Sequence, residues 1–370
     1  MRKTTLLAII LALALVLAAC GGGGGSQAPA QTPDNAGNAE AGGDQADEPP
    51  VSTVRVGMVT DIGGINDQSF NQSAWEGFLR AQTDFGVDIA VLESRTDADY
   101  LTNFETLVDD GRDLIVGVGF RMGDAIRIAA EHNPDVMFAI IDFAYSPEEV
   151  PNNNLNGVLF RVNEASFLVG VIAGLTTESN IIGFVNGMDS PVMHEFGVGF
   201  YAGVLTVNPE AEVLGQFANN FADPALGRAI ANMMYSDGAD VIFHAAGDTG
   251  NGVIEAAREH GRWVIGVDMD QHHLAPDNVL SSAMKRVDIA TYELIQSMVE
   301  GTFVGGSTII HDLVTGGVGI APSSNIHVAP DVLALVAEKQ AEIISGEIVV
   351  PNTQEEFLAA FPGTAYMNRT

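Results

Sequence analysis

From residue 54 onwards, short apolar runs rich in Val and Ile alternate with amphipathic stretches of helical spacing. The runs lack the strict alternation of a half-exposed strand, which is typical of parallel sheets covered by helices on both faces. The predicted strands are Val54–Val59, Ile89–Leu92, Leu114–Val118, Val136–Ile141, Gly157–Phe160, Ile181–Val185, Val213–Gln216, Val241–Phe243, Val264–Val267 and Val279–Ala283. The predicted helices include Gln72–Phe85, Phe196–Val207 and Asn251–His260. The pattern therefore predicts an α/β fold built from βαβ units.

The body of the chain contains an internal repeat. Four segments return in much the same order, each 126 to 128 positions later. The matching pairs are Asp110–Ile115 with Asp237–Ile242, Ala129–His132 with Ala256–His260, Phe138–Asp142 with Val264–Asp268, and Trp75–Gly77 with Tyr201–Gly203. Repetition at a fixed interval indicates two copies of one structural unit. We therefore expect two Rossmann-like, doubly wound lobes.

Two such lobes predict where a ligand would bind. In open parallel sheets the ligand lies beyond the carboxyl ends of the strands, so two lobes that face each other would share one cleft. The residues that follow predicted strands are the candidates for this cleft: Asp61, Phe120, Asp142, Asp189, Gly247 and Asp268.

The first 50 residues differ from the body. Arg2 and Lys3 precede the apolar run Leu6–Leu17, and Leu17-Ala18-Ala19-Cys20 follows. This run is too short and wrongly flanked for a spanning helix, so it predicts a secretory signal over residues 1–19. The tetrad resembles the bacterial lipobox, which implies that Cys20 is lipidated; an ordinary signal peptide with an incidental Cys is the alternative. Residues 20–50 carry Gly, Ala and acidic residues without large apolar side chains, and we expect a disordered tether.

Composition excludes several classes of partner. The formal net charge of −32 argues against nucleic acid and anionic lipid surfaces, because both would repel the chain. Cys20 is the only cysteine, so neither a disulfide framework nor a Cys-based metal site is expected. His272 and His273 form the only tight histidine pair, and adjacent side chains on an extended chain point apart. We therefore expect no metal and no cofactor.

Enzymatic alternatives have weak support in the sequence. A nicotinamide-dependent enzyme would suit the strands, but Gly117–Gly123 has one residue too many for G-x-G-x-x-G and lies within a lobe. Neither a G-x-x-x-x-G-K-[ST] phosphate loop nor a G-x-S-x-G nucleophile elbow occurs. A nucleoside hydrolase could use Asp142 and Asp268 as paired carboxylates, although no metal-ligand cluster accompanies them.

The stretch Val59–Asn71 resembles the opening signature of the basic membrane protein (BMP) lipoprotein family, which includes the purine nucleoside receptor of ABC importers. Further matching segments are Gly117–Phe120, Phe138–Asp142, Ser166–Gly170, Gly183–Asp189, Ala245–Gly250, Ile265–Asp268 and Lys285–Asp288. The likeness runs from about Val54 to Val304, although this chain has far fewer lysines than is usual in the family.

The resemblance implies a type I periplasmic-binding-protein fold, in which a three-strand hinge joins the lobes. We expect the first lobe at residues 51–163 plus 271–304 and the second at 164–270 plus 305–350. Residues 351–370 have no recognised family counterpart, and we expect either a disordered end or a strap over the second lobe.

The resemblance also implies a function without catalysis. The chain would be an extracytoplasmic solute-binding lipoprotein, held at the cell membrane through Cys20 alone and monomeric. It would capture a nucleoside, of the purine type, and deliver it to the permease and ATPase subunits of an ABC importer. A receptor of the same fold for a flavin or another flat ligand, or one coupled to a sensor, remains open because no sequence feature separates these readings.

Two aromatic residues are implied to hold the base. By the resemblance, Phe70 and Phe221 stack on opposite faces of the nucleobase. Periodicity alone favours a core position for Phe70, because it heads the apolar stripe of a predicted helix. Phe221 lies in a polar, turn-forming stretch where a large ring has no obvious core to join.

Polar residues complete the implied site. Asp61, Asn66, Asp67 and Ser69 surround the start of the first helix, where Asp67 and Ser69 could instead serve as N-caps.

Asp142 and Asp268 would accept hydrogen bonds from ribose hydroxyls, although either could be a simple turn residue. Lys285 is one of three lysines and would limit repulsion between these carboxylates, its alternative being a surface charge. Gly247 would permit close approach of the backbone to the ligand.

Overall fold

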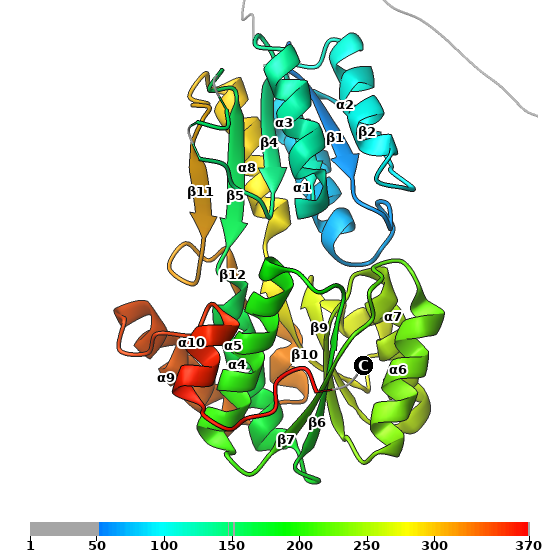
Figure 1. The fold of residues 1–370 in the computed structure, drawn as a ribbon, viewed down its shortest axis with the longest axis vertical. Helices are drawn as coiled ribbons and strands as arrows, with labels where there is room; N and C mark the ends of the chain where they lie inside the picture. Colours follow the sequence, from blue (N-terminus) through cyan, green and yellow to red (C-terminus); the bar gives the residue numbers. More distant parts are fainter. Residues whose placement is uncertain (1–51, 147, 151, 369–370) are drawn as a thin grey trace, which may run out of the picture. The chain divides into compact units, whose positions relative to one another are not determined.

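The computed structural model describes residues 52–146, 148–150 and 152–368, which lie within one compact unit. The predicted signal peptide, Cys20 and the tether lie outside the described residues. None of the helices in the described part combines the length and the hydrophobicity that a membrane span requires. The described residues form two six-stranded sheets, each with its own helices (Figure 1).

The first lobe is built on a parallel sheet of order β11-β5-β4-β3-β1-β2. Its strands are β1 (Arg55–Thr60), β2 (Asp88–Leu92), β3 (Leu114–Val118), β4 (Met137–Ile141), β5 (Leu155–Phe160) and β11 (Thr308–His311). Helices α1 (Phe70–Phe85) and α8 (Val287–Val299) pack together on one face, and α2 (Asp99–Asp109) and α3 (Gly123–His132) on the other. A short 3₁₀ helix, Phe120–Met122, precedes α3.

The second lobe has the sheet order β12-β10-β9-β8-β6-β7, in which only β12 is antiparallel to its neighbour. Its strands are β6 (Ile181–Asn186), β7 (Glu212–Phe217), β8 (Val241–Ala245), β9 (Trp263–Asp268), β10 (Val279–Lys285) and β12 (Val318–Ile320). Its helices are α4 (Val162–Thr176), α5 (Pro191–Val207), α6 (Pro224–Ser236), α7 (Asp248–His260), α9 (Pro330–Ser345) and α10 (Gln354–Ala360), with 3₁₀ helices at Gln271–Leu274 and Pro322–Ile326.

The two sheets have equivalent strand orders, as the internal repeat predicts. All ten predicted strands are present, and the fold class is confirmed. The inner strands form because their apolar side chains are buried on both faces; every residue of β3, for example, is buried, whereas the edge strand β2 is only partly buried.

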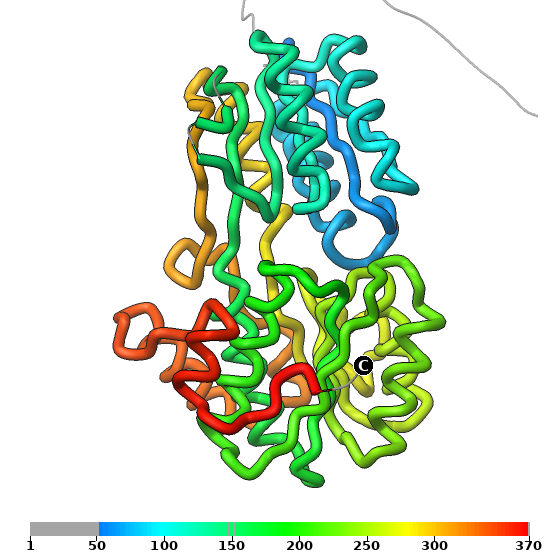
Figure 2. Tube along the Cα trace, viewed as in Figure 1, coloured from blue at the N-terminus to red at the C-terminus, as the bar shows by residue number. Residues whose placement is uncertain are grey.

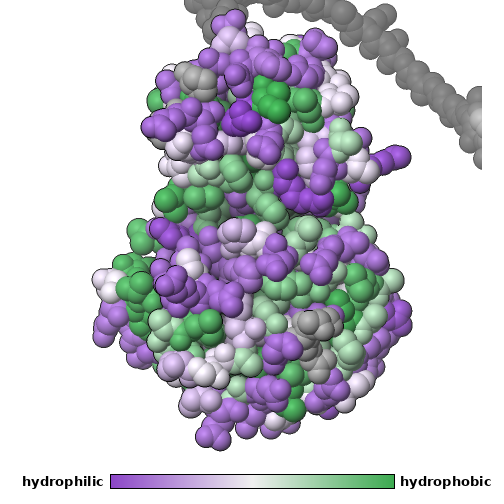
Figure 3. All heavy atoms as spheres, viewed as in Figure 1, coloured by the Kyte–Doolittle hydropathy of each residue, from purple (hydrophilic) through white to green (hydrophobic). Residues whose placement is uncertain are grey.

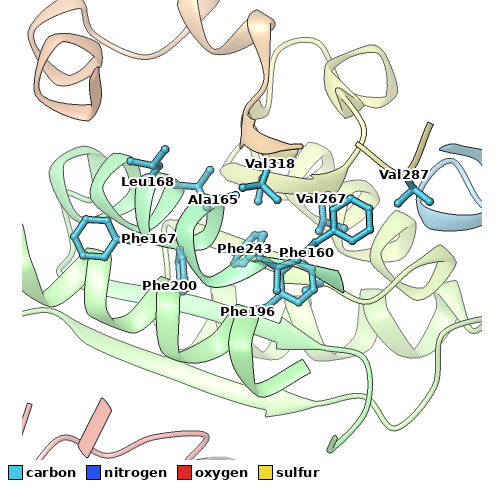
Figure 4. Close-up of a cluster of buried hydrophobic side chains, with 14 of the residues drawn as sticks. Phe160, Ala165, Phe167, Leu168, Phe196, Phe200, Phe243, Val267, Val287 and Val318 are labelled. Carbon is cyan, nitrogen blue, oxygen red and sulfur yellow. The ribbon is translucent and has the colours of Figure 1, made fainter. Parts of the chain in front are cut away.

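The densest packing lies between α4 and α5, the two most hydrophobic helices of the second lobe. A side chain at Gly203 would meet the backbone oxygen of Phe167 at 2.1 Å, so this position admits only glycine at the observed helix separation. Phe200 of α5 contacts Phe243 of the sheet, with ring centroids 4.9 Å apart (Figure 4). Helix α5 of this closely packed pair contributes Met193 and Phe196 to the cleft described below.

The chain passes between the lobes three times, after β5, after β10 and between β11 and β12 (Figure 2). The sheets divide the chain differently from the boundaries that we predicted. Strand β10 lies in the second sheet, not in the first lobe, and β11 lies in the first sheet, not in the second lobe. An apolar run such as β10 fits either sheet by its pattern alone, so the sequence could not place these crossings.

The described part of the C-terminal tail is ordered against the second lobe. Phe357 of α10 is fully buried, and its ring contacts Tyr201 of α5. The backbone N–H of Met367 also donates to the hydroxyl of Tyr201. The tail is therefore a strap over the second lobe, the second of the two expectations.

Candidate functional site

One cleft is lined by residues from both lobes, most of them at or just beyond the carboxyl ends of strands. On the face drawn in Figure 3, hydrophobic residues gather where the two lobes meet. The cleft contains a narrow cavity of about 50 Å³, and its whole empty space, including the part open to solvent, is about 550 Å³. The first lobe contributes Asp61, Ile62, Asp67, Phe70, Asn71, Gly119, Phe120 and Asp142, and the second contributes Met193, Phe196, Phe221, Ala245, Ala246, Gly247, Val267, Asp268 and Lys285.

Two carboxylates occupy equivalent ends of strands in the two lobes. Asp142 follows β4 and Asp268 ends β9, and both have left-handed backbone conformations, with φ of 69° and 64°. Such conformations cost free energy for residues other than glycine and tend to occur at functional sites. The two copies of the repeat therefore share both the residue type, Asp, and an unusual backbone conformation at this position.

Lys285, at the end of β10, is the cation of the cleft. Its ammonium donates to Asp142 Oδ2 at 2.5 Å, and the two side chains are only 2% and 8% exposed. The same ammonium lies 4.4 Å from the ring centroid of Phe70 and within 6 Å of the rings of Phe160 and Phe196. A buried cation is therefore held by one carboxylate and by three aromatic rings.

Asp268 joins the two lobes through a second contact. Ser69, in the first lobe, donates its hydroxyl to Asp268 Oδ2 at 2.5 Å. Burial raises the pKa of Asp268 to about 6, while the Lys285 charge and the Ser69 hydrogen bond act in the opposite direction. Asp268 is thus a buried acceptor whose charge depends on its partners.

The loop before α1 makes further contacts with the second lobe. Asn251 donates its side-chain amide to the backbone oxygen of Asp67, and Gln271 donates to that of Gln68, both at 2.9 Å. His273 Nε2 lies 3.1 Å from Gln68 Oε1. Together with Ser69 and Asp268, these contacts hold the lobes in a closed arrangement.

The two predicted stacking rings line the same cavity from opposite lobes. Phe70 is the first residue of α1 and is half-buried, whereas Ala74, Phe78 and Ala81 further along its stripe are fully buried. Phe221 lies in the loop before α6 and meets the ring of Phe120 edge-on, with centroids 6.5 Å apart. The apolar stripe is therefore core, and its first residue faces the cleft.

Asp67 acts as a cap of α1. Its carboxylate accepts four hydrogen bonds, from the backbone N–H groups of Ser69, Asn71 and Gln72 and from the side-chain amide of Asn71. The capping alternative therefore applies to Asp67, whose carboxylate accepts hydrogen bonds from the backbone N–H groups at the start of α1. Asn66, which we expected in the site, is exposed and is not among the residues lining the cleft, because the turn before Asp67 directs it outward.

Asp61 and Gly247 lie in the cleft as predicted. Burial raises the pKa of Asp61, although its carboxylate accepts hydrogen bonds from the Tyr100 hydroxyl and from the backbone of Ile62. Gly247 is the N-cap residue of α7, with φ of 56° and ψ of −137°, a backbone conformation that favours glycine. Asp189, the other strand-end candidate, is exposed and pairs with His194 at 2.8 Å, outside the cleft lining.

Sequence reasoning missed several residues of the cleft. Asn71 accepts from the Asp61 backbone and donates to Asp67, so it links two predicted residues. Met193 and Phe196, on α5, also line the cavity. The repeat could have found them, because α5 is the counterpart of α1 and Phe196 stands 126 positions after Phe70. Ala245, Ala246 and Val267 lie within the matching segments Ala245–Gly250 and Ile265–Asp268, although none of the three was named as a site residue.

Among the described residues, no group of three or more His, Cys, Asp or Glu side chains could hold a metal ion. The chemistry that the cleft offers is therefore recognition by aromatic rings, by buried carboxylates and by one ammonium group.

Comparison with known proteins identifies the family. Residues 54–354 match the model of the Bmp family, described as "ABC transporter substrate-binding protein PnrA-like". Basic membrane protein A of Borreliella burgdorferi is 37% identical over 82% of this chain and 89% of its own length. The ABC transporter nucleoside-binding protein BmpA of Lactococcus lactis is 33% identical over 81% of this chain and 89% of its own length.

Solved structures agree with this assignment. An ABC transporter solute-binding protein from Aeropyrum pernix has a TM-score of 0.72 and 30% identity, covering 83% of this chain and 96% of its own. The arabinose-binding component of a Shewanella transporter, at 13% identity and a TM-score of 0.56, shares the fold and covers 80% of this chain and 99% of its own. The chain therefore belongs to the Bmp family of ABC transporter substrate-binding proteins and has the type I periplasmic-binding-protein fold.

Proposed function

We propose that the protein captures an intact nucleoside, of the purine type, in the cleft between its lobes and delivers it to an ABC permease. The observation that carries this proposal is the pairing of Phe70 and Phe221, which line one cavity from opposite lobes. A flat heterocycle between two rings gains about 1–3 kcal/mol per stacking contact. The name of the L. lactis relative, a nucleoside-binding protein, supports the same ligand class.

The polar residues suit the sugar of a nucleoside. Asp268 accepts only the Ser69 hydroxyl on Oδ2, and Oδ1 of Asp142 has no hydrogen-bond partner among the described residues. Both carboxylates therefore retain acceptor capacity for ribose hydroxyls. A cleft that pairs buried acceptors with ligand hydroxyls discriminates strongly against analogues without them.

Capture requires the lobes to separate. The cavity of about 50 Å³ is narrow, and contacts between the lobes close it on several sides. We infer that bending at the three crossings opens the cleft and that ligand contacts to both lobes favour closure. The residues proposed to touch the ligand are Asp61, Phe70, Asp142, Phe221, Gly247, Asp268 and Lys285, while Asp67 and Ser69 position them.

Membrane attachment is a separate part of the proposal. Lipidation of Cys20 would keep the receptor at the outer face of the cell membrane, next to its permease. Expression of the full chain and of Cys20→Ser in a bacterial host, followed by detergent phase partitioning, tests this part. The unaltered chain is expected in the detergent phase and the variant in the aqueous phase; equal partitioning would contradict the anchor.

Isothermal titration calorimetry with a ligand panel tests the proposed specificity. Inosine, guanosine and adenosine should bind with a stoichiometry of one, and 2′,3′-dideoxyinosine should bind at least tenfold more weakly. Binding of riboflavin in preference to every nucleoside would assign the cleft to a different flat ligand and contradict the proposal.

A further inference from the structure

A second cavity lies in the first lobe, away from the cleft. Its volume is about 230 Å³, and it shares no lining residue with the cleft. It is bounded by α8, by the neighbouring strands β5 and β11, and by the loop that precedes β11, and it is partly open to solvent. We call it the α8 cavity. Its lining residues are Asn156, Val158, Ala290, Glu293, Leu294, Ser297, Thr302, Phe303, Val304, Ser307, Ile309 and His311.

The internal repeat explains why this space is open. In the second lobe, α4 packs directly on β10 and β12, and α9 covers α4 from outside. In the first lobe, the equivalent helix α8 packs on α1 and makes few contacts with β5 and β11. No described element of the first lobe takes the place of α9. The α8 cavity therefore lies where α4, the equivalent helix of the second lobe, packs directly on its strands.

The cavity wall contains a buried polar side chain without a partner. His311 is only 6% exposed, yet neither of its ring nitrogens has a hydrogen-bond partner within the described part of the chain. The ring nitrogens themselves are not fully enclosed, so they are open to a hydrogen-bonding group that enters the cavity. Burial lowers the pKa of His311, with the charges of Glu293 and Asp312 acting in the opposite direction. Its imidazole is therefore neutral at neutral pH and offers one donor and one acceptor.

Apart from the charged Glu293, the rest of the lining is apolar or already hydrogen-bonded. Val158, Leu294 and Ile309 give the cavity an apolar body. The amide of Asn156 donates to the backbone oxygen of Val304 and accepts from Ser307, so it holds the loop. Among the uncharged polar side chains of the lining, this leaves His311 without a hydrogen bond to the described residues. Glu293 is exposed, and its negative charge at the cavity disfavours anionic ligands.

We propose that the α8 cavity is a second ligand site, for a small neutral molecule with an apolar body and one hydroxyl or amide group that hydrogen-bonds to His311. The volume lies below the range of about 300–1,000 Å³ typical of pockets for drug-sized ligands, so the occupant is smaller than those.

The site lies beside the hinge. His311 ends β11, immediately before the third crossing, and its ring stacks on Phe160 with centroids 5.0 Å apart. Phe160 ends β5 before the first crossing, and its other neighbours include the Lys285 ammonium at 5.2 Å. Two stacked rings therefore separate the α8 cavity from the cation of the cleft.

Binding of 4-fluorobenzyl alcohol to the purified protein tests the proposal, because this probe has the inferred size and chemistry. Saturable broadening of its ¹⁹F NMR signal is expected, together with shifts of the His311 ring signals. Ala290→Phe, which fills the cavity, should abolish the broadening. His311→Phe keeps a stacking ring and removes the hydrogen bond, and it should weaken binding at least fivefold. His132→Phe, an exposed histidine of the same lobe, should bind as the unaltered protein does.

Three results would overturn the proposal. The first is a lack of saturable binding at millimolar probe concentration. The second is displacement of the probe by inosine with no shift of the His311 signals, which would place the probe in the cleft. The third is undiminished binding in His311→Phe, which remains decisive even where Ala290→Phe does not fold.

Discussion

Replacement of Lys285 by Met should destabilise the protein strongly, because it removes one partner from a buried ion pair. The Lys285 ammonium is the hydrogen-bond donor to Asp142 Oδ2, and Oδ1 has no partner among the described residues. The carboxylate of Asp142 would then remain in a site where it is 8% exposed, without its cation. Breaking such a pair typically costs about 3–5 kcal/mol, so we expect a loss of about 4 kcal/mol in the free energy of unfolding.

Two further variants separate this effect from a general effect of the substitution. Lys339→Met makes the same change at an ion pair whose side chains are 19% and 21% exposed, and it should cost less than about 1 kcal/mol. The double variant Lys285→Met with Asp142→Asn removes both charges and should recover part of the loss.

Urea unfolding at pH 7, followed by tryptophan fluorescence, measures these differences. Trp75 lies in the first lobe and Trp263 in the second, so the fluorescence signal follows the unfolding of both lobes. A loss in Lys285→Met no larger than that in Lys339→Met would refute the reasoning. A double variant less stable than Lys285→Met alone would refute it as well.

Three other predictions follow from the site. Phe221→Ala should weaken inosine binding by about 10- to 100-fold, from stacking worth about 1–3 kcal/mol, and unchanged affinity by calorimetry would contradict the sandwich. Asp67→Ala should lower the free energy of unfolding, measured with urea, by about 1–2 kcal/mol through loss of the α1 cap. Asn66→Ala should change it by less than about 0.5 kcal/mol, and equal losses in the two variants would contradict the capping role of Asp67. Burial, reinforced by the charge of Asp142, raises the pKa of Glu195 from 4.5 to about 7. The native state therefore holds the extra proton between these values, and stability falls as the pH rises through them. Glu195→Gln should reduce the fall in the free energy of unfolding between pH 5 and 8 by about 3 kcal/mol in total, at about 1.36 kcal/mol per pKa unit; an unchanged fall would contradict this assignment.

The strands of both sheets were predictable because their side chains are buried on both faces and leave continuous apolar runs. The repeat then predicted two equivalent lobes and directed attention to the ends of strands, where Asp142 and Asp268 lie. Short strands carried no such signal. Only one of the four residues of β11 is buried, and β12 has only three residues, so neither was predicted.

Contacts between the lobes were also beyond sequence reasoning. The hydrogen bond from Ser69 to Asp268 joins residues 199 positions apart, and the pairing of Lys285 with Asp142 depends on which sheet receives β10. Asn66 is an error of the opposite kind, a residue that was predicted in the site but does not line it. The motif match placed its side chain in the site, whereas the local turn exposes it. Local patterns specify elements, whereas the closure of one lobe on the other specifies which polar groups meet.

The α8 cavity illustrates what a duplicated fold can leave unmatched. The repeat predicts equivalent strands, but it does not predict equivalent packing around them. The helix that covers α4 in the second lobe comes from the C-terminal part of the chain, beyond both copies of the repeat. Packing differences of this kind emerge only when both lobes are compared in space.

Native mass spectrometry after incubation with inosine most directly tests the central claim, that the cleft binds an intact nucleoside, because it measures the mass of the bound molecule. The account predicts a single added mass equal to intact inosine, which disappears in the variant carrying both Phe70→Ala and Phe221→Ala. The absence of any nucleoside adduct, or the appearance of free hypoxanthine and ribose in the solution, would contradict a receptor that binds its ligand without altering it.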